Sequence, residues 1–85
     1  MNQITRIIYM EQILDDALAA LKVPGLRTPE LESRVTQLFE YYFGPLWRAD
    51  FEDDCAGKLP SDLKRGILSE DAIYNLLIDW KELQG

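Results

Sequence analysis

The fold of this chain is decided by residues 41–77, YYFGPLWRADFEDDCAGKLPSDLKRGILSEDAIYNLL. The stretch contains an aromatic run, a Gly-Pro corner, an acidic cluster and a serine that precedes an apolar-periodic segment. Proline cannot continue a helix, glycine relaxes the backbone, and serine caps helix N-termini. Signals this closely spaced predict one compact arrangement of short helices.

The segments before this stretch predict a helical hairpin. Residues 3–22 and 29–43 both carry apolar side chains at steps of three and four, which is the helical period. A Val-Pro-Gly turn at 23–25 ends the first helix, and Thr28 caps the second, with Pro29 at its first position. Because the link is short, we expect the two helices to be antiparallel neighbours.

Two further helices are expected after the Gly-Pro corner. The first is short, at about 46–53, and the second runs over about 69–83 with acidic residues in its first turn. No stretch of four to eight residues alternates as a strand would. The sequence therefore predicts an all-α fold, a small helical bundle that forms a single domain over residues 1–85.

The apolar faces of the hairpin make more specific predictions. The narrow seam of the first helix consists of Ile7, Met10, Leu14, Ala17 and Leu21. Such a seam can pair with a second copy of the chain, so self-association is one hypothesis. The expected apolar face of the second helix consists of Leu31, Val35, Leu38 and Tyr42. Glu30 and Arg34 are one turn apart on this helix, and we expect them to form an ion pair.

The composition excludes several classes of protein. A net charge of −6 opposes direct nucleic-acid binding, because such proteins neutralise phosphates with basic residues. The chain has no histidine and one cysteine, Cys55, so Cys-His and Ser-His pairs and an internal disulfide are excluded. Nothing resembles a signal peptide or a membrane span. We expect a cytoplasmic protein that is not an enzyme, uses no cofactor and does not contact a membrane.

The acidic cluster allows two interpretations. It consists of Asp50, Glu52, Asp53 and Asp54. A calcium loop that starts at Asp50 fails, because its glycine position falls on Cys55 and its final glutamate position on Ser61. A looser magnesium site remains open. The alternative is an internal charge network or a solvated face, with pairing cations from the nearby bases Arg48, Lys58, Lys64 and Arg65.

The aromatic residues are concentrated around the corner. Six of the nine lie between residues 39 and 51: Phe39, Tyr41, Tyr42, Phe43, Trp47 and Phe51. One interpretation is a hub where the helices meet and bury these rings. The other is a partner-binding site, since tyrosine, tryptophan and arginine are enriched at binding hot spots. For that site the candidates are Tyr41, Trp47 and Arg48.

The pattern over Tyr41 to Leu77 also resembles a known family. The residues that carry the resemblance are Tyr41, Tyr42, Trp47, Asp50, Phe51, Glu52, Gly57 to Pro60, Asp62 to Gly66, Leu68 to Ala72, Tyr74, Leu76 and Leu77. They are similar to the pattern of small bacterial proteins known as the domain of unknown function 4298 family. The resemblance implies a discrete bacterial domain and no particular activity. Cys55 stands where that pattern is expected to have glutamate, which weakens the acidic cluster as a strict ligand set.

Three functions follow as hypotheses. The first is a non-enzymatic module that binds an unidentified protein, or a second copy, through an aromatic and charged surface. The candidate residues of that surface are Tyr41, Trp47, Arg48, Asp50, Glu52, Asp53, Asp54, Lys64 and Arg65. The alternative is an acidic effector that mimics nucleic acid and blocks a nucleic-acid-binding protein of a host. The third is a carboxylate site for a divalent metal ion.

Overall fold

The helices of the computed structural model begin and end close to the expected turn residues. The structure describes residues 2–82. In chain order the elements are α1 (Gln3–Lys22), the 3-10 helix η1 (Pro24–Leu26), α2 (Pro29–Phe43), α3 (Pro45–Cys55), the 3-10 helix η2 (Gly66–Leu68) and α4 (Glu70–Glu82). Within this part of the chain there is no strand. The predicted all-α helical bundle is confirmed.

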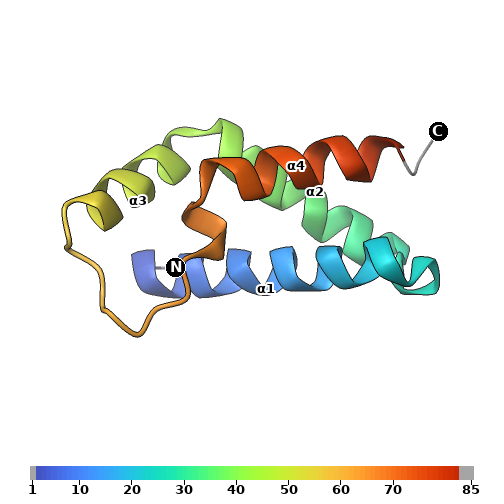
Figure 1. Cartoon of the computed structure of the whole chain (residues 1–85), viewed down its shortest axis with the longest axis horizontal. Coiled ribbons are helices and arrows are strands. Elements are labelled where there is room, and N and C mark those ends of the chain that lie inside the picture. Colours follow the sequence, from blue (N-terminus) through green and yellow to red (C-terminus); the bar gives the residue numbers. More distant parts are fainter. Residues whose placement is uncertain (1, 83–85) are drawn as a thin grey trace.

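The helices form an elongated bundle of 39 × 20 × 18 Å. In Figure 1, α1 runs along the long axis, α2 folds back across it, and α3 lies at the end where α1 begins. Two hydrogen bonds place α4 antiparallel to α2. The Tyr42 hydroxyl donates to the Glu70 carbonyl at 3.4 Å, and the Trp80 indole donates to Glu32 at 3.2 Å. The end of each helix therefore lies beside the start of the other.

The predicted N-cap of α2 is present, whereas the bounds of α3 differ from those predicted. The Thr28 hydroxyl accepts from the Leu31 amide at 3.1 Å, which confirms the predicted cap. Helix α3 begins at Pro45 and reaches Cys55, so it is longer at both ends than the expected 46–53. The predicted end of α4, at residue 83, lies outside the described residues.

All four α-helices contribute to the apolar core. The buried apolar side chains are Ile7, Ile13, Leu14, Ala17, Ala20, Leu31, Val35, Leu38, Tyr41, Trp47, Leu59, Ile67, Leu68, Ile73, Leu76 and Trp80. Three of the five seam residues of α1, Ile7, Leu14 and Ala17, are buried within the chain and are not exposed to a second copy. Self-association of the chain stays a prediction. On α2, Tyr41 rather than Tyr42 completes the buried face.

The ion pair predicted within α2 is also wrong. Arg34 donates to Asp16 of α1 at 2.9 Å rather than to Glu30 of its own helix. The antiparallel hairpin brings α1 within reach, so a contact between helices replaces the local one.

The short helix η2 lies against α1 through a side chain-to-backbone contact. Glu11 accepts a hydrogen bond from the Ile67 amide at 2.7 Å. A Cβ atom at Gly66 would lie 2.8 Å from the other Glu11 carboxylate oxygen. Glycine therefore permits the close approach that lets Glu11 hold η2 in place. Among residues 2–82, no helix has both the length and the apolar character to cross a membrane.

Candidate functional site

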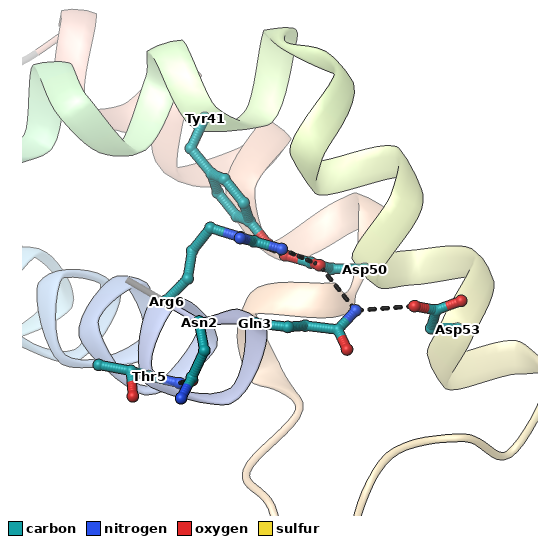
Figure 2. Close-up of polar contacts among 7 residues, drawn as sticks. All are labelled: Asn2, Gln3, Thr5, Arg6, Tyr41, Asp50 and Asp53. Carbon is teal, nitrogen blue, oxygen red and sulfur yellow. Dashed lines mark hydrogen bonds and ion pairs between the residues drawn. The ribbon is translucent and has the colours of Figure 1, made fainter.

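A fully buried carboxylate, Asp50, lies where α1, α2 and α3 meet (Figure 2). Arg6 binds it through two nitrogens, at 2.6 Å and 3.0 Å. The Tyr41 hydroxyl donates to it at 2.5 Å, and the Gln3 amide donates at 3.0 Å. The same amide of Gln3 reaches Asp53 at 2.8 Å. We refer to these five side chains as the polar cluster.

The polar cluster fixes the charges of Arg6, Tyr41 and Asp50. Burial alone would raise the pKa of the Asp50 carboxyl. Hydrogen bonds from Arg6, Tyr41 and Gln3 outweigh burial and hold that pKa below its ordinary value of 3.8. The hydrogen bond to Asp50 raises the pKa of the Arg6 guanidinium, and burial raises the pKa of the Tyr41 phenol. These three groups therefore do not titrate near pH 7, where general acid–base catalysis requires a suitable pKa.

Three candidates for the interaction surface are buried instead. Tyr41, Trp47 and Asp50 are 6%, 5% and 0% exposed, so their placement on a binding surface is wrong. The Trp47 indole donates to the Ile67 carbonyl at 2.8 Å, and its ring stacks on Phe51 with centroids 5.1 Å apart. A buried tryptophan needs a partner for its N–H, and the η2 backbone supplies one. For the rings of Tyr41 and Trp47, the interpretation as a buried hub where the helices meet is confirmed.

The other acids of the cluster are mostly paired within the chain. Asp54 accepts from Arg65 at 2.5 Å, and the Asp53 carboxylate lies 3.9 Å from the Lys58 ammonium. Glu52 is exposed. Of the four bases expected to pair here, Lys58 and Arg65 do so. Arg48 and Lys64 form no ion pair with any residue between 2 and 82.

These pairings engage carboxylates that the metal-site and nucleic-acid-mimic hypotheses would use. No group of three or more cysteine, aspartate or glutamate side chains in residues 2–82 is arranged to hold a metal ion. A phosphate mimic needs carboxylates that face a partner. Asp50 instead faces Arg6 inside the molecule, and Asp54 faces Arg65.

An exposed apolar surface lies at the junction of α2 and α3. We call it the aromatic corner, and it consists of Tyr42, Phe43, Leu46 and Arg48 around the buried ring of Trp47. Phe43 is 69% exposed and Leu46 is 49% exposed. A hollow of about 320 Å³ is lined by four of these side chains and by Gly44. The corner presents both apolar area and the unpaired cation of Arg48.

A family model for the Domain of unknown function (DUF4298) matches residues 7–85. The chain belongs to the DUF4298 family. The match includes most of the polar cluster and the whole aromatic corner. No curated protein and no solved structure matches the chain.

The polar cluster combines residues inside and outside the DUF4298 match. Tyr41, Asp50 and Asp53 lie within it, whereas Gln3 and Arg6 precede residue 7. Neither Gln3 nor Arg6 is among the site residues expected from the sequence. A signal was present: Arg6 is seven residues before Ile13 and eleven before Ala17, so it lies on the same buried face. An arginine at such a position requires a buried acid.

Proposed function

We propose that this chain is a small, non-enzymatic protein-interaction module of the bacterial cytoplasm that binds a partner protein through the aromatic corner. One observation carries the proposal. At 69% exposure, Phe43 is more exposed than any other large apolar side chain in residues 2–82. Large exposed apolar groups beside charged residues are typical of binding sites on soluble proteins.

The corner is rigid beneath its exposed residues. Phe43 contacts Tyr42 edge-on with ring centroids 5.2 Å apart, and Tyr42 contacts Trp47 in the same way at 5.0 Å. Trp47 is in turn stacked on Phe51 and hydrogen-bonded to η2. A side chain supported in this way loses little conformational freedom on binding, which favours affinity.

The chemistry of the corner indicates what the partner presents. Phe43 and Leu46 would enter an apolar depression, and Arg48 would pair with a carboxylate at its edge. Since Arg48 has no ion-pair partner among residues 2–82, its guanidinium is available for such a contact. The sole cysteine and the lack of histidine support a role without catalysis, in a reducing compartment.

The test is a comparison of three immobilised proteins: the native chain, Phe43→Ser and Tyr74→Ser. Tyr74 is 54% exposed on α4, so its substitution is a matched loss of an exposed aromatic ring. We expect one protein from a bacterial lysate to bind the native chain and Tyr74→Ser but not Phe43→Ser.

The captured protein is then purified and its affinity measured by calorimetry. A loss of tenfold or more for Phe43→Ser, which corresponds to about 1.4 kcal/mol, supports the corner as the site. If all three proteins capture the same set with equal affinity, the proposal is wrong. Melting curves of the variants confirm that each is folded.

A further inference from the structure

A second surface, separate from the aromatic corner, lies between α1 and the segment that precedes η2. It is a groove of about 450 Å³. Its apolar lining comes from Ile4 and Ile8 on α1 and from Pro60 and Leu63 across from them. In Figure 1 the segment before η2 lies along the lower edge of the molecule, whereas the α2–α3 junction lies along the upper edge.

The charged lining of the groove is mainly acidic. It includes the carboxylates of Glu11, Asp15 and Asp62 and a single ammonium, that of Lys64. Glu11 is already engaged by the Ile67 amide. Asp15 and Asp62 are exposed and form no ion pair with residues 2–82, so they are available to cations from outside. This groove differs in sign from the aromatic corner, whose unpaired charge is the cation Arg48.

The wall opposite α1 is held in shape by one arginine. Arg65 donates to the carbonyls of Pro60 at 2.8 Å, Ser61 at 3.3 Å and Leu63 at 2.9 Å. Its remaining nitrogen binds Asp54 at the end of α3. A segment without helix or strand is thus fixed by a single guanidinium, and the groove exists before any ligand binds. Preformed sites avoid the ordering cost of binding.

We propose that this acidic groove binds a basic amphipathic helix from a partner protein. The apolar side chains of that helix would contact Ile4, Ile8 and Leu63, and its lysines or arginines would pair with Asp15 and Asp62. The groove follows α1 from residue 4 to residue 15, about 16 Å at 1.5 Å per residue, which is the length of three helical turns. Helix-in-groove binding with anchors at this spacing is a common recognition mode.

Charge complementarity selects this occupant over others. The chain has a net charge of −6, so its field attracts cationic segments and repels anionic ones. A second copy would bring the same acidic surface to the groove and is disfavoured for that reason. The inference does not depend on the aromatic corner and adds a distinct binding site to the proposed module.

The experiment is selection of a random 12-residue peptide library on the native protein, followed by fluorescence anisotropy with the selected peptides. We expect selected peptides to carry lysine or arginine together with leucine, isoleucine or phenylalanine at helical spacing. Their affinity should fall at least tenfold for Ile8→Lys and also for Asp15→Lys/Asp62→Lys. These positions are exposed, so the variants are expected to fold, which circular dichroism verifies.

The matched control is Phe43→Ser, which should bind the selected peptides as the native chain does. This control separates failure of the groove from failure of the proposed function. The inference is overturned if no peptide is enriched, if the enriched peptides lack basic residues, or if Ile8→Lys binds them unchanged. It is also overturned if sedimentation shows a dimer of the native chain that Ile8→Lys abolishes, since the occupant would then be a second copy.

Discussion

Two arginines connect the α1–α2 hairpin to later parts of the chain, one at each end of the elongated molecule. At the start of α1, Arg6 pairs with Asp50, whose side chain is 0% exposed. After α1, Arg27 pairs with Glu32, whose side chain is 36% exposed. Arg27 also lies over the Trp80 ring at 3.8 Å and donates to the Trp80 carbonyl at 3.0 Å.

The two ion pairs differ in the exposure of the acid rather than in that of the arginine. Both arginine side chains are largely covered, at 17% and 13% exposure. If Arg6 is lost, Asp50 keeps its charge without water to solvate it, and that is costly. If Arg27 is lost, Glu32 can turn toward water. Exposure of the remaining acid therefore decides how much each arginine contributes to stability.

Arg6→Ala is the substitution expected to have the largest effect. It should lower the free energy of unfolding by about 3 kcal/mol, because it leaves a buried carboxylate without its cation. Urea unfolding at pH 7, followed by circular dichroism, measures this loss. The exposed Arg48→Ala is the control and should change stability by less than about 0.5 kcal/mol. Equal midpoints for the two variants would show that the buried pair contributes no more than a surface residue.

A smaller effect is expected when Asp50 loses only its charge. The folded-state pKa of Asp50 lies below its ordinary 3.8. Its contribution is therefore fully present above about pH 4 and is lost as pH falls through the folded pKa. Asp50→Asn should be less stable than the native chain at pH 7, and the difference should shrink below pH 4. Urea midpoints from pH 7 to pH 2 test this, and a constant difference over that range would contradict it.

Smaller effects again are expected for two arginines outside the polar cluster, Arg27 and Arg34. Arg27→Ala should cost about 1 kcal/mol, the sum of a modest cation–π contact and a partly exposed ion pair. Arg34→Ala removes the pair with Asp16, in which both side chains are about one-third exposed, and should cost less than about 0.5 kcal/mol. The same urea assay ranks both against Arg6→Ala. A loss at Arg27 equal to that at Arg6 would show that exposure of the acid is not what separates the two ends.

Sequence reasoning worked where a signal and its effect lie within a few residues. The Thr28 cap and the Gly44-Pro45 corner act on neighbouring backbone, so the helices could be placed from them. The polar cluster could not be predicted in this way, because Arg6 and Asp50 are 44 residues apart in the sequence and only the folded bundle brings them together. The helical period alone could not predict whether Tyr41 or Tyr42 belongs to the buried face of α2 either. The choice depends on α1 covering one side of α2.

The contacts of α1 have a consequence for the order of assembly. Its partners are spread over the whole chain, up to the bond between Glu11 and the Ile67 amide, 56 residues away. During synthesis α1 is made before η2 and α4, yet its surface is complete only after both have been added. Until then part of its apolar face remains uncovered, a state prone to aggregation or chaperone capture. Among the helices of residues 2–82, α1 therefore stays partly uncovered until α4 has been translated.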